Sequence, residues 1–413
     1  MKIILVADHA YINGGQSKVA IESARGLAGR GHKVVYLAAV GPADAGLAQA
    51  GVETVILGQT DVSQAKSLAS FGVQWLWNTK AAQTLKALLA ECDPADTLVH
   101  VHAWAKAVSP SIGPVLRASP VRSVFTMHEY YLACPNGGFY DYPVSAPCHR
   151  VPLSIGCLGH NCDSRNYSRK LMRVGRHVLM RQSGMIGSLG AVITLSRLQR
   201  EALAPYLPAD TRYFDVSNPV DAEPLGYKGE GVPGNFIFVG RISPEKGPKL
   251  FAEAARLAGQ RAVFVGDGPL AAELKAEYPE AEILGWKSPD EVKLQLRAAR
   301  ALVFPSVWYE GQPLTVLESL AMGTPVIVSD VCAGREAVSD GVSGLWFKSG
   351  DAGALAGAMR RLAEDVVARE MARAAYDLFW ADPLTMDRHL DGLEGVYAAA
   401  LESCVLERWL PNR

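Results

Sequence analysis

The stretch WYEGQPLTVLESLAMGTPVIVSD, residues 308–330, is the most informative part of the sequence, because it joins a turn and a helix to a buried strand. Gly311 and Pro313 keep the residues before them out of the helix, since Gly weakens a helix and Pro favours its first turn. The spacing predicts a helix over residues 314–322. The apolar run 326–328 then predicts a strand buried on both faces, which is typical of a parallel sheet.

Two carboxylates stand around this turn: Glu310 precedes the helix and Glu318 lies within it. A helix N-terminus has unpaired backbone N–H groups, here expected from Gln312, Leu314 and Thr315, and such groups bind anions. A carboxylate beside them would repel a phosphate but could accept hydrogen bonds from sugar hydroxyls. Phosphate beside a polyhydroxyl group is the outline of a nucleotide sugar, which we therefore expect as the ligand.

Short apolar runs alternate with helical stretches along the chain, which predicts parallel sheets covered by helices on both faces. In the first half we expect strands at residues 3–8, 34–40, 54–58, 97–103, 121–129, 191–196 and 212–220. In the second half we expect strands at residues 235–240, 262–266, 281–286, 301–306 and 325–330. The segment 221–234 is rich in Gly and Pro and has no periodicity, which predicts a domain boundary.

Length and charge limit the class of protein. The chain has 413 residues, enough for two domains of about 150–200 residues each. Its net charge of −1 gives no overall attraction to nucleic acid, and we expect no nucleic-acid partner. The start MKIILVADHA lacks the long apolar segment of a signal peptide, and no apolar run reaches the ~18 residues of a membrane span. We therefore expect a cytoplasmic protein.

Three further segments occur in a familiar order and spacing: FVGRISPEKG (238–247), FVGDGPL (264–270) and GREAVSDGVSGLWF (334–347). Together with two glutamates separated by seven residues, Glu310 and Glu318, they resemble the retaining glycosyltransferases of the large family 4 type, which have the GT-B fold. The resemblance is dense in the second half of the chain. In the first half it thins to a glycine turn and two strand ends that carry histidines.

The resemblance implies an α/β protein of two Rossmann-like, parallel-sheet domains that face a central cleft. Residues 1–220 are then an acceptor-side domain and residues 235–380 a nucleotide-sugar domain. In the family the last helices return to the first domain, which we expect of residues 381–413. An irregular insertion at residues 134–165 departs from simpler members of the family. It begins six residues after His128, and could roof the acceptor side.

Two cations follow the first strand of the second domain. Arg241 and Lys246, in a loop that begins at Gly240, match the phosphate loop of the family. Sugar transfer builds negative charge on a leaving diphosphate, and fixed cations stabilise that charge. Two cations make a metal ion unnecessary, so we expect no cofactor for catalysis. The alternative is a pair of solvated surface cations.

The two carboxylates then divide the donor between them. We expect Glu310 to hold hydroxyls of the transferred sugar and Glu318 to accept from the ribose. Two carboxylates also occur in glycoside hydrolases, but a hydrolase of neutral sugars would not need the cationic loop. In the resembling family a histidine at the position of His128 contacts the sugar beside the reacting carbon. His102, one strand earlier, is a weaker candidate.

Two other positions are candidates for donor contact. Gly14 and Gly15 form the first strand-to-helix turn, where backbone can approach an anion, although a plain tight turn has the same sequence. Trp286 follows a strand near the expected nucleotide base. It could stack on the base, but a tryptophan in the core is the favoured interpretation.

The insertion carries a group of cysteines within 29 residues: Cys134, Cys148, Cys157 and Cys162. Three alternatives stay open, namely a structural zinc ion, free thiols and disulfides. The spacings lack the paired Cys-x-x-Cys of a typical zinc site, although His149 and His160 stand nearby. The remaining cysteines are scattered and expected to be free thiols: Cys92, Cys332 and Cys404.

The segment 164–181 has six Lys or Arg and no acid, with apolar residues between them. At 100° per residue Leu171, Val174 and Val178 share one side of a helix. A basic amphipathic helix can lie on an anionic membrane, and it can also be an ordinary packed helix with a solvated cationic face. The second outcome is the usual one.

The sequence therefore predicts a retaining, metal-independent glycosyltransferase of polysaccharide or glycolipid biosynthesis. We expect a UDP- or GDP-linked donor and a glycan or lipid-linked acceptor. The protein would be cytoplasmic or peripheral at the inner face of the plasma membrane. Two alternatives remain: a nucleotide-sugar epimerase of the same architecture, and a catalytically silent nucleotide-sugar-binding protein.

Overall fold

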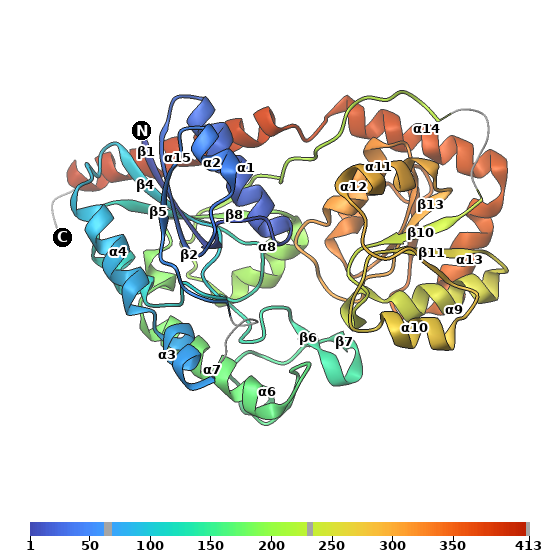
Figure 1. The fold of residues 1–413 in the computed structure, drawn as a ribbon, viewed down its shortest axis with the longest axis horizontal. Coiled ribbons are helices and arrows are strands. Elements are labelled where there is room, and N and C mark those ends of the chain that lie inside the picture. Colours follow the sequence, from blue (N-terminus) through green and yellow to red (C-terminus); the bar gives the residue numbers. More distant parts are fainter. Residues whose placement is uncertain (62–67, 229–233, 410–413) are drawn as a thin grey trace.

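The computed structural model describes residues 1–61, 68–228 and 234–409, which form two α/β domains side by side (Figure 1). Each domain is built on one sheet whose neighbouring strands are all parallel. This arrangement confirms the predicted fold class. Part of the expected domain boundary, residues 229–233, lies outside the described residues.

The first domain has a seven-stranded sheet in the order β3-β2-β1-β4-β5-β8-β9. Its strands are β1 (Lys2–His9), β2 (Lys33–Val40), β3 (Glu53–Ile56), β4 (Thr97–Val101), β5 (Arg122–Thr126), β8 (Ala191–Thr194) and β9 (Tyr213–Asp215). Its helices are α1 (Gly15–Gly29), α2 (Ala45–Gln49), α3 (Leu68–Leu76), α4 (Thr79–Ala90), α5 (Ile112–Ala118), α7 (Tyr167–Gln182) and α8 (Arg197–Leu203). Aliphatic cores lie on both faces of the sheet, as the continuous apolar strands require.

The second domain has a six-stranded sheet in the order β12-β11-β10-β13-β14-β15. Its strands are β10 (Phe236–Val239), β11 (Ala262–Val265), β12 (Glu282–Ile283), β13 (Ala301–Phe304), β14 (Val326–Ser329) and β15 (Gly344–Phe347). Its helices are α9 (Pro248–Ala258), α10 (Ala271–Glu277), α11 (Pro289–Ala298), α12 (Leu314–Ala321), α13 (Ala352–Ala363) and α14 (Asp365–Ala381). The helix expected over residues 314–322 is α12, which begins directly after Pro313.

The last helix, α15 (Met386–Trp409), leaves the second domain and packs on the first (Figure 1). Its Leu390, Leu393 and Tyr397 belong to one core of the first sheet. The preceding helix α14 contributes Ala375 and Phe379 to a core of the second sheet. The chain therefore crosses between the domains twice. No described helix is both long enough and apolar enough to span a membrane.

The insertion between β5 and α7 has little regular structure. It contains a short antiparallel pair, β6 (Tyr140–Asp141) with β7 (Ala146–Pro147), and the single-turn helix α6 (Ile155–Leu158). No sequence pattern predicted this pair, because each strand has only two residues. It also failed to predict β15, and the strands expected at 212–220 and 281–286 are much shorter, as β9 and β12.

Strand order determines where a ligand can bind. In each sheet the order reverses beside one central strand: β1 lies between β2 and β4, and β10 lies between β11 and β13. Open parallel sheets bind ligands outside the carboxyl ends of the strands at this switch point. The loops after β1, β4, β10 and β13 are therefore the places to look for a site.

Candidate active site

The loop after β10 carries the predicted cations and turns sharply at glycines. Gly240 and Gly247 have positive φ values of 148° and 66°. A Cβ at Gly247 would collide with the carbonyl oxygen of Pro305, so only glycine lets this loop lie against the loop after β13. The glycines thus bring Lys246 beside Glu310, although 64 residues separate them in the sequence.

Lys246 and Glu310 form an ion pair at the centre of the predicted site. The Lys246 Nζ lies 2.6 Å from the Glu310 Oε1, and the Ser306 hydroxyl donates to the same oxygen at 2.8 Å. The Lys246 ammonium also lies 5.7 Å from the ring centre of Trp308. The lysine is therefore held between a carboxylate and an aromatic face.

The backbone of Glu310 is strained. Its φ is 45°, in the left-handed region that costs a residue with a side chain about 1–2 kcal/mol. The Tyr130 hydroxyl donates to the Glu310 carbonyl oxygen at 2.9 Å and fixes this peptide from the first domain. Strained residues of this kind cluster at functional sites. Because Tyr130 is two residues after His128, this contact also brings the His128 strand end to the second domain.

The N-terminus of α12 faces the glycine turn of the first domain. The backbone N–H groups of Gln312, Leu314 and Thr315 donate no hydrogen bond within the described chain. A Cβ at Gly15 would lie 3.9 Å from a methyl group of Leu314, so the turn and the helix are in near contact. The Gln312 side chain is engaged, because its Oε1 accepts from the Asn218 backbone N–H at 2.7 Å.

Glu318 lies one turn into α12 and is partly buried. Burial raises the pKa of its carboxyl group, while the nearby Lys18 and Lys293 oppose that shift. Its carboxylate accepts no hydrogen bond from any residue that the structure describes. A partly buried carboxylate without a donor in the protein can accept hydrogen bonds from a ligand, so Glu318 is suited to a ligand that brings hydroxyl donors.

His128 stands directly after β5 and contacts His102, which stands after β4. The His128 Nε2 lies 3.2 Å from the His102 Nδ1, and their rings stack. Burial, with smaller contributions from His389 and Lys106, lowers the pKa of His128 to about 3. The imidazole is therefore neutral at physiological pH and can exchange hydrogen bonds with a sugar but cannot act as a cation.

His102 has a buried Nε2 that makes no hydrogen bond in the described chain. It lines a cavity of about 200 Å³ together with Gly14, Gly15 and Lys106. In the sequence analysis His102 is a weaker candidate and Lys106 is not singled out. The signal that could have identified both as site residues is their position after β4, at the switch point of the first sheet.

Arg241 and Trp286 are predicted site residues with exposed side chains. The side chain of Arg241 makes no hydrogen bond or ion pair within the described residues, so its guanidinium is free for a ligand. The favoured interpretation of Trp286 as a core residue is wrong, because 75% of its surface is exposed. Trp286 follows β12, a strand of two residues at the edge of the sheet. Such a short edge strand offers no core in which an indole could be buried.

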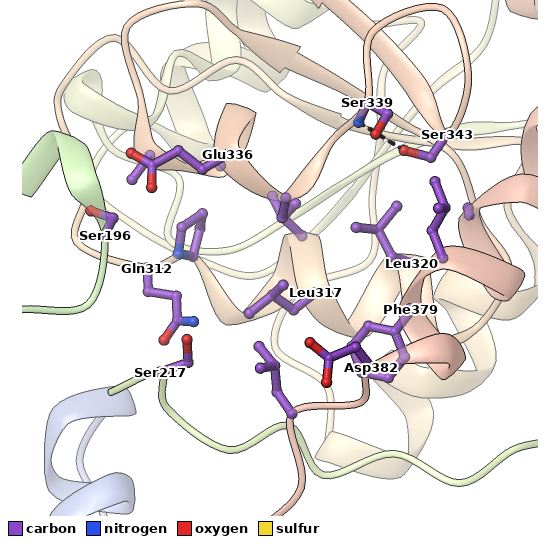
Figure 2. A pocket seen from close by; sticks show the side chains of 18 of the residues that line it. Ser196, Ser217, Gln312, Leu317, Leu320, Glu336, Ser339, Ser343, Phe379 and Asp382 are labelled. Carbon is purple, nitrogen blue, oxygen red and sulfur yellow. Dashed lines mark hydrogen bonds between the residues drawn. The ribbon is translucent and has the colours of Figure 1, made fainter. Parts of the chain in front are cut away.

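A cavity of about 380 Å³ lies on the other side of α12, where the two domains meet (Figure 2). Leu317, Leu320 and Phe379 line its apolar side, and Gln312 and Glu336 stand at its polar end. The Glu336 carboxylate accepts from the backbone N–H groups of Arg197 and Leu198 at 2.9 and 2.8 Å. A residue of the second domain therefore caps α8 of the first, which the sequence did not indicate.

The cysteines of the insertion are free thiols in the structure: Cys134, Cys148, Cys157 and Cys162. Of the three alternatives, the structure therefore has the free thiols and not the disulfides. No group of three or more His, Cys, Asp or Glu in the described chain is arranged to hold a metal. The Lys170 ammonium lies 3.1 Å from the Cys162 Sγ and 3.7 Å from the Cys157 Sγ, where it keeps a metal cation away. The arrangement does not fit a zinc ion. The side chain of Cys404 lies outside the described residues.

Helix α7, from the predicted basic segment, presents its side chains in an unexpected way. Lys170 and Arg176 are only 1% and 3% exposed, whereas Leu171 and Val178 are exposed. The interpretation as a helix with a solvated cationic face is therefore wrong for Lys170 and Arg176, although Arg165 and Arg181 are exposed. The reason is tertiary: Arg176 stacks on Trp75 and Tyr131, which come from distant parts of the first domain.

Comparison with known proteins gives two family matches. The family described as Glycosyltransferase Family 4 matches residues 13–224, and the family described as Glycosyl transferases group 1 matches residues 233–365. The two matches together cover both domains and contain every predicted site residue. The first of them alone spans more than half of the chain.

A relative in Escherichia coli, UDP-Gal:alpha-D-GlcNAc-diphosphoundecaprenol alpha-1,3-galactosyltransferase, is 32% identical over 152 residues, which are 33% of this chain and 38% of that protein. The amylovoran biosynthesis glycosyltransferase AmsK of Erwinia amylovora is 30% identical over 148 residues, which are 32% of this chain and 36% of that protein. The chain thus aligns with less than half the length of either relative.

Solved structures match over almost the whole chain. A glycosyltransferase from Rickettsia africae ESF-5 has a TM-score of 0.67 at 16% identity, covering 97% of this chain and 98% of that one. Anabaena HepE in complex with UDP and glucose has a TM-score of 0.65 at 16% identity, covering 97% and 100%. At these identities the likeness concerns the fold, which is GT-B.

Proposed function

The chain belongs to glycosyltransferase family 4, and we propose that it transfers a sugar from a nucleoside-diphosphate sugar to a glycan or lipid-linked glycan. The observation that carries the proposal is the Lys246–Glu310 pair, 2.6 Å apart at the meeting of the two domains. A cation for the diphosphate and a carboxylate for the sugar hydroxyls stand together there. Beside them the N-terminus of α12 offers free N–H groups.

The donor contacts follow from where each group lies. Arg241 and Lys246 bind the diphosphate, and the N–H groups of α12 bind its oxygens or those of the sugar. Glu318 accepts hydrogen bonds from the ribose hydroxyls, and these supply the partner that its carboxylate lacks within the described chain. The exposed indole of Trp286 stacks on the base, since exposed aromatic faces bind bases by stacking.

The transfer step breaks the bond between the anomeric carbon and the diphosphate oxygen and forms a bond to an acceptor oxygen. The acceptor proton passes to the leaving diphosphate on the same face of the sugar, so the anomeric configuration is retained. Arg241 and Lys246 stabilise the charge that develops on the diphosphate. His128, which is neutral, holds a sugar hydroxyl beside the reacting carbon. With two cations at the leaving group, we propose that catalysis needs no metal ion.

Structures of related fold support the kind of donor. Anabaena HepE has been solved with UDP and with UDP-glucose, and the Escherichia coli relative is named for UDP-Gal and a diphosphoundecaprenol acceptor. We therefore propose a UDP-linked or GDP-linked donor and a role in polysaccharide or glycolipid biosynthesis. We propose that this protein works in the cytoplasm, as a peripheral enzyme at the inner face of the plasma membrane.

A thermal-shift panel with a chelator present tests the donor. Ligands that bind only the folded state raise the melting temperature by mass action, so UDP or GDP and their sugar conjugates should raise it and ADP should not. Release of the free nucleotide in the presence of a glycan acceptor then separates a transferase from a silent binding protein. An epimerase would convert the sugar without releasing nucleotide. A panel in which no nucleotide shifts the melting temperature would contradict the proposed donor site.

A further inference from the structure

One face of the first domain exposes apolar side chains that no described element covers. It is formed by the end of the insertion and by α7, and we call it the α6–α7 face. Figure 1 shows α3, α6, α7 and the β6–β7 pair along one edge of the domain. The exposed apolar residues of this face are Val144, Val151, Ile155, Tyr167, Leu171, Met172 and Val178. Ile155 is 91% exposed and Val151 62%.

Helix α7 buries two cations and exposes apolar side chains, unlike an ordinary surface helix. A soluble helix normally buries its apolar stripe and exposes its charges. Here Lys170 is buried and donates to the carbonyl oxygens of Cys157 and His160 at 2.9 and 3.2 Å. Arg176 is buried as well, and donates to the Ala105 carbonyl oxygen. Both cations are satisfied inside, and apolar residues take the outside.

The charge around this face has one sign. Between residues 143 and 182 the chain has seven Lys or Arg and a single acid, Asp163, in a protein whose net charge is −1. The Asp163 carboxylate is buried and paired with Arg173 at 2.9 Å. Arg165, Arg169 and Arg181 form no ion pair with any described residue. An apolar surface bordered by unpaired arginines therefore has no exposed acid of its own segment beside it.

We propose that the α6–α7 face docks on an anionic lipid membrane. Apolar side chains of this size enter the boundary between headgroups and acyl chains, while arginines bind lipid phosphates. Charge complementarity favours this occupant, because the arginines have no acidic partner in the described chain. The inference rests on the proposed function and deepens it, because a lipid-linked acceptor would be presented at the membrane surface.

The insertion connects this face to the donor site. A Cβ at Gly138 would lie 2.9 Å from the ring of Trp308, the residue over which the Lys246 ammonium lies. Phe139 and Tyr130 contact Tyr309, the next residue of the same turn. The segment that would touch the membrane at one end therefore packs on the Glu310 turn at the other. A membrane-bound acceptor would reach the site along this segment.

Vesicle co-sedimentation of the full chain tests the proposal. We expect the protein to sediment with vesicles of phosphatidylcholine and phosphatidylglycerol, to sediment less as salt is raised, and to stay in solution with phosphatidylcholine alone. The double variant V151S/I155S should lower the bound fraction at least ~10-fold, and R165A/R169A/R181A should remove the preference for anionic vesicles. Val151, Ile155, Arg165 and Arg181 are exposed, and Arg169 is half-buried.

The matched control is L294S/V366S, which removes two apolar side chains of the second domain that are 68% and 59% exposed. It should bind vesicles as the unchanged protein does. The proposal is overturned if the unchanged protein ignores anionic vesicles, or if V151S/I155S binds like the control. A dimer in solution that V151S/I155S dissolves would make this face a contact between copies and overturn it too. Nucleotide shifts should be the same in all variants, so a failure of docking and a failure of the donor site are separately visible.

Discussion

The Lys246 Nζ and the Glu310 Oε1 lie 2.6 Å apart, so the cation expected at the diphosphate is held by the carboxylate expected at the sugar. Only 24% of the lysine side chain and 9% of the glutamate side chain are exposed. A donor that enters this site must separate or bridge the pair. Each of the two residues therefore binds either the other residue or the ligand. Substitutions of Lys246 and of Glu310 should for that reason have opposite effects on nucleotide binding.

Replacing Glu310 with Gln should lower the rate of transfer by ~10²-fold or more, because a fixed group aimed at the reacting sugar is lost. Nucleotide affinity should stay the same or rise, since Lys246 no longer has an anionic partner within the protein. Replacing Lys246 with Ala should instead weaken nucleotide binding ~10–100-fold, the size of a lost hydrogen bond to a charged group. Calorimetric titration with the nucleoside diphosphate and initial rates with the full donor measure the two effects.

The matched control for the lysine is Lys249→Ala. Lys249 lies three residues away and forms surface ion pairs with Glu273 and Glu277 at 2.5 and 2.9 Å. Surface pairs contribute little, so this change should leave both nucleotide binding and transfer unaltered. If Glu310→Gln weakens nucleotide binding as much as Lys246→Ala does, the assignment of Glu310 to the sugar is wrong.

The positive φ of Glu310 makes a separate prediction about stability. Glu310→Gly and Glu310→Ala both remove the carboxylate, but only glycine adopts a φ of 45° without strain. The glycine variant should therefore be more stable than the alanine variant by about 0.5–1 kcal/mol in urea unfolding. Equal stabilities would mean that the turn relaxes when the Lys246 contact is lost. The same pair of substitutions at an extended, exposed residue should show no such advantage for glycine.

Some of the predicted site residues lie together in the structure, namely Lys246 with Glu310 and Gly15 with Leu314, and the signals for them are local. Gly14 and Gly15 mark a strand-to-helix turn, Lys246 follows a strand end, and Pro313 begins a helix, so each position can be read from a few neighbouring residues. Parallel sheets then bring strand ends to one edge without further information. The pairing of Lys246 with Glu310 could not be predicted in this way, because it depends on Gly247 lying against Pro305.

The errors concern side chains whose environment is set by distant parts of the chain. Periodicity finds the faces of α7 but does not say which face is inside. Arg176 is buried because Trp75 and Tyr131 stack on its guanidinium, and these residues lie about 100 and 45 positions earlier in the chain. Trp286 is exposed because β12 is short, and a short edge strand offers no core in which to bury it.

The raised pKa of Glu318 predicts that nucleotide affinity falls on the acid side of its pH profile, which we call the acid limb. Its carboxylate must be ionised to accept from two ribose hydroxyls, and burial favours the protonated form. Affinity should therefore begin to fall, as pH is lowered, at a higher pH than an ordinary Glu would give, and binding in that window should release a proton. Calorimetry between about pH 4.5 and 7 measures both. Glu318→Gln should bind more weakly and lose the limb.

In the unliganded protein the same pKa shift affects stability, and there the ionised carboxylate is unfavourable near neutral pH. A carboxyl group whose pKa is raised on folding contributes stability below its unfolded pKa, and this contribution is lost as pH rises through the folded pKa. Unliganded protein should therefore gain from Glu318→Gln near neutral pH, while the liganded protein should not. If the substitution destabilises the unliganded protein at neutral pH, the carboxylate has a structural partner and is not reserved for a ligand.

The contact of Glu336 with α8 leads to a prediction about the stability of the interface between the two domains. Its carboxylate accepts two N–H groups at the start of α8, so Glu336→Ala leaves that helix end without its cap from the second domain. Loss of an N-terminal cap costs about 0.5–2 kcal/mol, and the loss here also removes a contact between domains. We expect a lower unfolding midpoint and a larger radius of gyration in small-angle scattering of the unliganded protein.

Glu336→Gln is the conservative comparison, because an amide oxygen still accepts one of the two hydrogen bonds and should recover part of the loss. Glu253→Ala, an exposed residue whose pair with Arg256 spans 3.7 Å on one helix, is the control for removing a surface charge and should change neither quantity. A Glu336→Ala protein with lower stability but an unchanged radius would mean that the cap stabilises α8 alone. In that case the domains are held by α15 and by the Tyr130–Glu310 hydrogen bond, and the spacing of the donor site does not depend on Glu336.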